Sequence, residues 1–567
     1  MEPKDGGGGK RLVAASTEIS FSEQPATNRG AESELLTVWR ARAMSPAARS
    51  LARRRASSLL ASTRHSRAAC GAPSPRVSPD PSEPCVSSAP SFRTSAPRRV
   101  SSPRDASALG VARVSSEARP RDGARGDDRA HSGVLLRDFL TKALYDKKDG
   151  YFARAAVPVG TIAEPIAFSS LLGADDYARA LDLRYRRLAK QWLTPVEIFK
   201  PHYAEAVARY VLHRYRQEDE SRGYPLRVYE IGGGAGTHAA GFLRYVRKHA
   251  PAVFAKTEFV SVEISDALAA TARRAVRDAL DGEKHTQART NKKSQNKTSR
   301  DSDVYSVVRG DAADRAAWGA ADAAPCFVVA LEVLDNLPHD KVVLGERQSR
   351  STTEALESWF QTRVRFDPET NTHVEHHAQP LSDALAVRAM AASAAADSAE
   401  RNARSFARRV ARAAEEALFP PSRAVAYLPT GCLKLLETLH GARPNHRLVA
   451  ADFDSLPGVT LPGRNAPLVA AQARGGKTRD LPTYLAEVGN ADVFFPTDFA
   501  RLRVLDEAAR RTVSKSDAVA RRDERARAEI LTTRAFMERW ADVEATATRS
   551  GYNPLLQDFA NTKFFLS

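Results

Sequence analysis

The stretch RVYEIGGGAGT, residues 227–237, decides the predicted fold. An apolar run that favours β structure breaks into a turn containing Gly232, Gly234 and Gly236, and a long amphipathic run follows. This order predicts a strand, a tight turn and a helix. Glycine suits such a turn because it adopts positive φ and lets a ligand approach backbone N–H groups. An ordinary glycine-rich loop is the alternative interpretation.

Three further predicted strands end in glycine or an acidic residue. Residues 258–264 carry Glu263 near their end, residues 305–309 run into Gly310 and Asp311, and residues 326–331 run into an acidic loop that begins at Glu332. Ligands of open α/β sheets lie at the carboxyl ends of the strands, where an acidic side chain holds ribose hydroxyls. The series therefore predicts a cofactor site of nucleotide type.

The glycine spacing distinguishes between cofactor classes. A dehydrogenase fingerprint requires glycine three places after its second glycine, where this chain has Thr237, and no GxxxxGK[ST] motif is present. The order E-x-G-x-G-x-G from Glu230, followed by Glu263, Gly-Asp at 310–311 and an acidic loop at 332–338, instead resembles S-adenosylmethionine-dependent methyltransferases. The predicted cofactor is S-adenosyl-L-methionine.

Residues 1–130 are rich in Ser, Ala, Pro and Arg and lack apolar periodicity, which predicts a disordered leader. From Met44, residues 44–68 form a basic amphipathic pattern typical of an organelle transit peptide, whether translation begins at Met1 or at Met44. We expect import into the mitochondrial matrix, with the chloroplast as the alternative destination. A nucleic-acid-binding or solvated basic tail is the other interpretation. The net charge of +17 does not by itself indicate nucleic-acid binding, because a transit peptide is removed.

The remaining chain predicts three regions: a helical cap at 131–222, a cofactor-binding core at 223–345, and a helical insertion with completion of the sheet at 346–567. Residues 284–300 read as a surface insertion and 381–418 as one or two long helices. Strand–helix alternation resumes at 424–452, which predicts that the parallel sheet is completed there, and 466–471 and 492–495 are further strands. Glu197 falls in a predicted extended loop whose conformation is set by Pro195. It is interpreted either as a solvated cap or as part of a loop that binds substrate or cofactor.

The chain predicts no metal site and no membrane span. Its four cysteines form no CxxC pair, and the histidines of 373–377 read as surface residues of a hairpin. No apolar run approaches the ~20 residues that cross a bilayer.

Several motifs in one order resemble the MidA-like methyltransferases, whose eukaryotic members include mitochondrial protein arginine methyltransferases that assist assembly of respiratory complex I. They are DGYF at 149–152, TPVE at 194–197, YEIGGGAGT at 229–237, SVEIS at 261–265, GDAAD at 310–314, LEVLDNLP at 331–338, YLPTGCLKLLE at 427–437, ADFDSLPG at 451–458 and ADVFFPTDF at 491–499. The resemblance implies an α/β fold with a Rossmann-like, seven-strand-type methyltransferase sheet carrying additional helical elements and insertions. It implies that the glycine turn, with Glu230, and Glu263 bind the methionine and ribose groups of the cofactor, and that Asp311 faces the adenine amine. It also implies a protein substrate, a subunit of complex I, and no nucleic-acid partner.

Glu332 and Asp335 are the predicted catalytic residues. A guanidinium stays protonated near neutral pH, so it is a poor nucleophile unless carboxylates orient it and localise its charge. The two side chains lie three residues apart beside the predicted cofactor site, where both address one guanidinium. In the alternative reading, Glu332 holds the cofactor or caps a helix. A cofactor-binding assembly chaperone without turnover, and a small-molecule or RNA methyltransferase, are the alternative functions.

Overall fold

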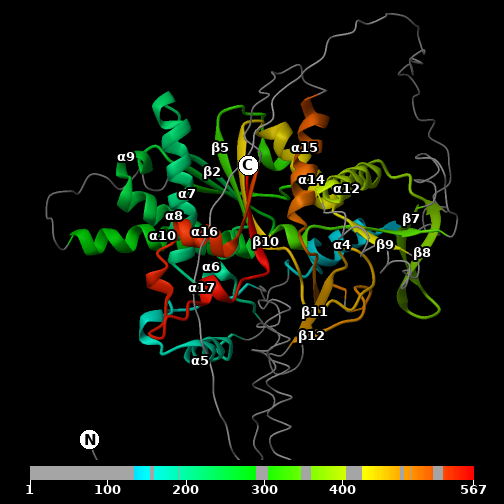
Figure 1. Ribbon diagram of the computed structural model, residues 1–567, viewed down its shortest axis with the longest axis horizontal. Coiled ribbons are helices and arrows are strands. Elements are labelled where there is room, and N and C mark those ends of the chain that lie inside the picture. Colours follow the sequence, from blue (N-terminus) through cyan, green and yellow to red (C-terminus); the bar gives the residue numbers. More distant parts are fainter. Residues whose placement is uncertain are drawn as a thin grey trace, which may run out of the picture. The chain divides into compact units, whose positions relative to one another are not determined.

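A computed structural model describes residues 133–153, 159–188, 191–288, 304–345, 359–403, 424–472, 478–486, 488–514 and 528–567 (Figure 1). The predicted leader lies outside these residues, as do most of the predicted insertion at 284–300 and the end of the predicted helical segment after residue 403. The described residues all belong to one compact unit. The predicted region boundaries at 222 and 345 stay predictions.

A seven-stranded sheet forms the centre of the fold. Its strands are β14 (Glu529–Thr532), β15 (Thr562–Leu566), β10 (His446–Phe453), β5 (Cys326–Leu331), β2 (Arg227–Ile231), β3 (Glu258–Glu263) and β4 (Tyr305–Arg309), in that spatial order. The five strands from β10 to β4 are parallel, and β15 runs antiparallel to both β10 and β14. In chain order the parallel strands read 3-2-1-4-5, the doubly wound arrangement, whose topological switch point lies between β2 and β5. The predicted α/β, Rossmann-like fold is confirmed.

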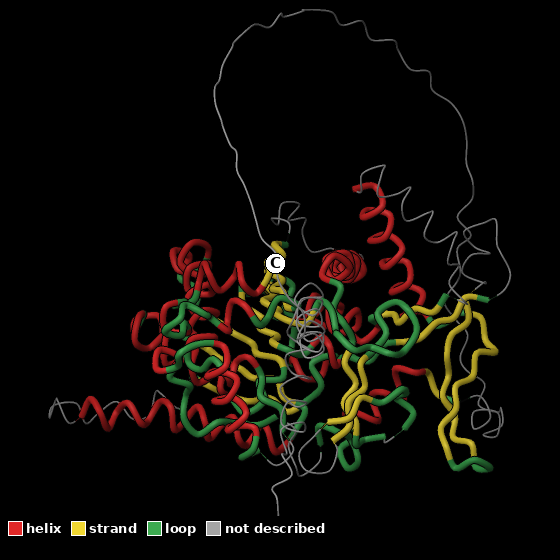
Figure 2. The backbone as a smooth tube through the Cα atoms, turned by 60° about the horizontal axis from the view of Figure 1, so that its bottom comes forward, coloured by secondary structure: helices red, strands yellow, loops and turns green. Residues whose placement is uncertain are grey.

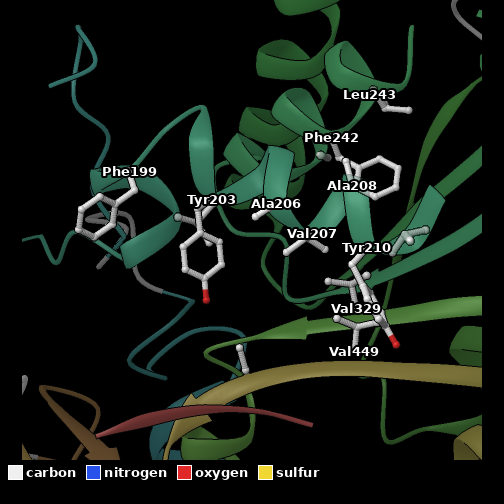
Figure 3. Packing of buried hydrophobic residues seen from close by; sticks show 14 of the residues in the cluster. Phe199, Tyr203, Ala206, Val207, Ala208, Tyr210, Phe242, Leu243, Val329 and Val449 are labelled. Carbon is white, nitrogen blue, oxygen red and sulfur yellow. The ribbon is translucent and has the colours of Figure 1, made fainter. Parts of the chain in front are cut away.

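Helices cover both faces of this sheet. On one face lie α7 (His202–Glu218), α8 (Thr237–His249) and α10 (Asp266–Ala288), whose buried apolar residues share one core with Val228, Val329 and Val449. Figure 3 shows residues of α7 and α8 in this core, together with Val329 and Val449. On the other lie α12 (Ala384–Ala403), α14 (Thr430–Ala442) and α15 (Phe499–Ser514), which pack on Val328 and Leu448. Side chains alternate between the faces of a strand, so the continuous apolar run of β5 supplies both cores, as expected for a central parallel strand.

Two smaller sheets stand apart from the central one (Figure 2). One has the order β1 (Val134–Leu135), β7 (Trp359–Asp367), β6 (Asp340–Leu344), β9 (Val425–Leu428), with β8 (Thr372–Pro380) on β7. The other is β12 (Thr478–Asp480), β11 (Leu468–Gln472), β13 (Ala491–Phe494). The expectation that the alternation at 424–452 continues the parallel sheet is therefore only half right: β10 joins it, whereas β9 pairs antiparallel with β6. Local periodicity identifies a strand but not its partner, and β6 was not among the predicted strands.

The remaining helices are α4 (Leu136–Tyr145), α5 (Ala174–Tyr185), α6 (Pro195–Ile198), α9 (Pro251–Phe254), α16 (Thr533–Trp540) and α17 (Pro554–Gln557). The extended loop predicted around Glu197 is wrong, because α6 forms one helical turn there. Pro195 occupies its first turn and the Thr194 hydroxyl accepts from the Glu197 N–H, so the sequence carries a helix start in place of a loop. Among the described helices none is long and apolar enough to cross a bilayer.

Candidate active site

A cavity of about 240 Å³ opens at the carboxyl ends of β2, β3, β4 and β5. Five predicted site residues line it: Gly232, Gly234, Glu263, Asp311 and Glu332. The structure therefore brings together groups spread over 100 residues of sequence, at the switch point where a doubly wound sheet binds its ligand. The other four predicted site residues, Glu230, Gly236, Glu197 and Asp335, do not line this cavity.

The glycines of the turn serve different purposes. Gly234 has φ +56°, and a Cβ added to it would meet only Val159, at 3.8 Å, so the space in front of its backbone is open. Gly236 has φ +84° and packs so closely on α10 that an added Cβ would lie 2.7 Å from the Cα of Ala272. Gly234 thus leaves room for a ligand, and Gly236 allows the turn to pack closely against α10.

Glu263 lies buried at the end of β3, beside this turn. Its carboxylate accepts the N–H of Gly234 at 3.3 Å and the N–H of Ser265 at 2.9 Å. Burial raises its pKa to about 7, against the opposing effect of these backbone donors. The carboxylate is held in position by backbone and lines the cavity, as a group that accepts ribose hydroxyls requires.

Glu230 points away from the cavity into a buried polar chain. Its carboxylate accepts from Ser261 at 2.7 Å and pairs with Nδ1 of His238 at 2.7 Å, and the Tyr305 hydroxyl donates to Ser261 at 3.1 Å. A Cβ at Gly233 would lie 2.3 Å from a Glu230 oxygen. Glu230 therefore supports the glycine turn from the buried, core side.

Glu197 also acts from outside the cavity. Its buried side chain accepts the Ile162 N–H at 2.7 Å and binds Lys200 and the hydroxyl of Thr237. Thr237 is the first residue of α8, directly after the glycine turn. Glu197 thus ties the segment around Ile162 to the turn.

Helix α4 forms a wall of the cavity that the sequence analysis did not assign to the site. Arg137, Thr141 and Tyr145, spaced four residues apart and hence on one helix face, line the cavity. Arg137 pairs with Asp340 at 2.6 Å and Asp383 at 2.7 Å, which anchors α4 to β6 and to the start of α12. In the sequence, only the four-residue spacing of these side chains pointed to a shared helix face, and the same spacing is found in helices that serve only the core.

A second cavity, of about 130 Å³, adjoins the first. Both share four lining residues, Phe152, Val159, Glu332 and Asn336. Beyond those, the second is lined by Trp192, Leu193, Thr194, Asp335, Phe453, Leu456, Leu468, Asp492, Phe494 and Phe559. Among the described residues, this lining holds three carboxylates and five aromatic rings but no Lys, Arg or His. Such a surface favours a cation.

The two predicted catalytic carboxylates both line the second cavity, on a strained turn. Glu332 has φ +55°, a conformation uncommon for a residue other than glycine, and its N–H donates to the Ala451 carbonyl at 2.8 Å. Asp335 is 2% exposed, and its Oδ1 has no hydrogen-bond partner among the described residues. Burial raises the pKa of both carboxyls well above the usual range, and the nearby Asp452 carboxylate raises them further.

Asp452, at the end of β10, holds this turn in place and was not predicted as a site residue. Its Oδ2 accepts the N–H groups of Leu334 at 2.8 Å and Asp335 at 3.2 Å. An acidic residue at the end of a predicted strand was the signal that identified Glu263 and Glu332 as site residues. The sequence of β10 carries the same signal at Asp452.

One group of potential metal ligands exists among the described residues, away from both cavities: His440, His446 and Asp506. His440 pairs with Asp506 at 2.8 Å, and Nδ1 of His446 donates to the Arg443 carbonyl at 2.7 Å. These contacts account for a buried polar cluster that joins α14, β10 and α15.

The sequence pattern of a protein family described as putative S-adenosyl-L-methionine-dependent methyltransferase matches residues 206–515, more than half of the chain. The chain belongs to this family. Its cofactor is S-adenosyl-L-methionine. The lining of the first cavity suits that molecule, because the open backbone of Gly234 and the carboxylates of Glu263 and Asp311 all line this cavity.

One relative and one solved structure are similar to this methyltransferase over more than half of its length. The mitochondrial protein arginine methyltransferase NDUFAF7 homolog of Schizosaccharomyces pombe is 20% identical over 364 residues, which cover 63% of this chain and 71% of that protein. A COG1565 superfamily member from Burkholderia thailandensis, solved with bound S-adenosyl-homocysteine, is 15% identical with a TM-score of 0.43, over 77% of this chain and 88% of that one.

Proposed function

We propose that this methyltransferase transfers methyl groups to arginine side chains of a protein, with the acceptor guanidinium in the second cavity. The observation that carries the proposal is the lining of that cavity. It places Glu332, Asp335 and Asp492 among aromatic rings with no cationic side chain of the described residues, directly beside the cofactor cavity. A planar cation with five N–H donors matches several carboxylates at once.

In the proposed cofactor site, the backbone around Gly232 and Gly234 faces the methionine part, Glu263 accepts the ribose hydroxyls and Asp311 faces the adenine amine. Asp311 is held for this by the N–H of Ala313, which donates to its Oδ1 at 2.8 Å. Glu230, Gly236 and Glu197 then act as positioning residues, since none of them lines either cavity.

The bound cofactor supplies a methyl group on a sulfonium, already activated for displacement. The protein's task is to orient the guanidinium and to exclude water. Burial raises the pKa of both Glu332 and Asp335, which favours the uncharged form of each carboxyl in the absence of a cation. An arriving guanidinium favours their ionised forms. Methylation releases one proton from the guanidinium, and in this proposal Asp335 takes it on Oδ1, which has no hydrogen-bond partner among the described residues.

The test of this proposal is the identity of the labelled residue. The purified chain is incubated with radiolabelled cofactor and peptides that present Arg, Lys or citrulline in one sequence context, and mass spectrometry locates the methyl group. Label on arginine alone supports the proposal. Label on lysine, or on nucleic acid or small molecules in place of peptide, would overturn it, and cofactor binding without any transfer would favour the chaperone alternative.

The proposal extends to a mitochondrial location and to a complex I subunit as substrate. It is supported by the transit-peptide pattern at 44–68, by the resemblance to mitochondrial complex I assembly factors, and by the name of the fission yeast relative, which describes that protein as mitochondrial. A fluorescent fusion that begins at Met44 should enter mitochondria. Fluorescence confined to plastids, or to the nucleus and cytosol, would contradict this part of the proposal.

A further inference from the structure

Four residues line both cavities and so mark the place where the two adjoin, which is called the passage below: Phe152, Val159, Glu332 and Asn336. The family's cofactor donates its methyl group from a sulfonium, and the acceptor has to lie in line with the bond that breaks. If donor and acceptor occupy adjoining cavities, the sulfonium lies at this passage.

Among the described residues, Phe152 is the only aromatic one that lines the passage, and neighbouring rings hold it in place. Its ring stacks on Tyr145 with centroids 5.5 Å apart and an interplanar angle of 16°, and it meets Tyr151 edge-on at 5.1 Å. The Tyr145 hydroxyl donates to the Asn336 carbonyl at 2.9 Å, which ties this stack to another residue of the passage. A ring fixed in this way is pre-organised to receive a ligand.

We propose that the face of Phe152, supported by Tyr145, is the wall against which the sulfonium of the cofactor lies, so that this site selects the charged cofactor over its uncharged thioether product. An aromatic face attracts a cation, most strongly where water is excluded. The product, S-adenosyl-homocysteine, lacks the positive charge and gains only apolar contact from the same ring. The ring thus weakens binding of the product relative to the substrate, independently of which side chain accepts the methyl group.

The charge on the ligand is the variable that tests this proposal. Calorimetry with the full chain compares three ligands: S-adenosylmethionine, sinefungin, whose amine carries a positive charge at the same place, and S-adenosyl-homocysteine. In Phe152→Leu, which keeps an apolar side chain but removes the π face, we expect affinity for the two charged ligands to fall about tenfold. Affinity for S-adenosyl-homocysteine should change less than about twofold.

Leu268→Val is the matched control. Leu268 is buried and lines the cofactor cavity but not the passage, so its shortening should affect the three ligands equally. Pentafluorophenylalanine at position 152 keeps the shape of the ring and reverses its charge distribution, so it tests the proposal even if Phe152→Leu does not fold. It should weaken both charged ligands selectively. An equal change for all three ligands, or no change, would overturn the proposal.

Discussion

Replacing Glu263 with glutamine should make the stability of the apo protein less dependent on pH. The pKa of Glu263 rises from 4.5 to about 7 on folding, because the carboxyl is buried. The folded state therefore binds a proton that the unfolded state has released, so this group destabilises the protein as pH rises from about 4.5 through about 7. The shift corresponds to about 3 kcal/mol of the free energy of unfolding, of which about 2.5 kcal/mol is lost between pH 5 and pH 8.

The measurement is the free energy of unfolding from denaturant titration, without cofactor, for wild type and Glu263→Gln at pH 5 and pH 8. The variant also loses a backbone contact at Gly234 or Ser265, but that cost is the same at both pH values. The difference between the two proteins should therefore shift by about 2.5 kcal/mol in favour of the variant between pH 5 and pH 8. Parallel pH dependences would refute the reasoning, because they would mean that Glu263 is ionised throughout.

The glycine turn and its support give two further predictions. Gly234→Val places a side chain in the open cofactor cavity, so calorimetry should show loss of cofactor affinity. Gly223→Val is the control: Gly223 has φ +75° and nothing lies within 4 Å of an added Cβ, so this variant imposes similar backbone strain but should keep its cofactor affinity. Wild-type cofactor affinity in a folded Gly234→Val protein would reject the assignment of the cavity to the cofactor. Glu197→Gln breaks a buried pair with Lys200 and should lower the free energy of unfolding by about 1.5–3 kcal/mol. Glu538→Gln, in an exposed helical pair, should cost under about 0.5 kcal/mol, and equal costs would show that the buried contacts of Glu197 contribute nothing special.

The parts of the fold that the sequence predicted are those whose signals are local. Strands β2 to β5 each combine an apolar run with a glycine or carboxylate at the end, and that pattern alone placed Glu263 and Asp311 in one cavity. The second cavity was not predictable in this way. It brings Phe152 together with Phe559, and its carboxylates come from the turn after β5 and from the separate sheet that contains β13. Contacts between residues hundreds of positions apart leave no periodic trace in one sequence.

The orientation of Glu230 shows a second limit. The motif identified the residue correctly as part of the turn, but spacing does not tell whether a side chain faces the ligand or the core. The buried partners His238 and Ser261, which hold the Glu230 side chain toward the core, lie on helix α8 and on strand β3. Likewise, Pro195 suggested a loop, whereas Thr194 before it provides the cap of a helix.

The central claim is that Asp335 orients an arginine guanidinium, and the most direct test is methyl transfer by Asp335→Asn. A charge-assisted hydrogen bond is worth about 1.5–3 kcal/mol, so the rate of transfer to an arginine peptide should fall roughly ten- to a hundredfold. Cofactor affinity, measured by calorimetry on the same preparation, should stay close to that of wild type, because Asp335 lines only the second cavity. Asp454→Asn, which removes a partly exposed partner of Lys563 directly after β10, serves as the control with unchanged rate. Transfer to arginine at the wild-type rate in Asp335→Asn would contradict the account.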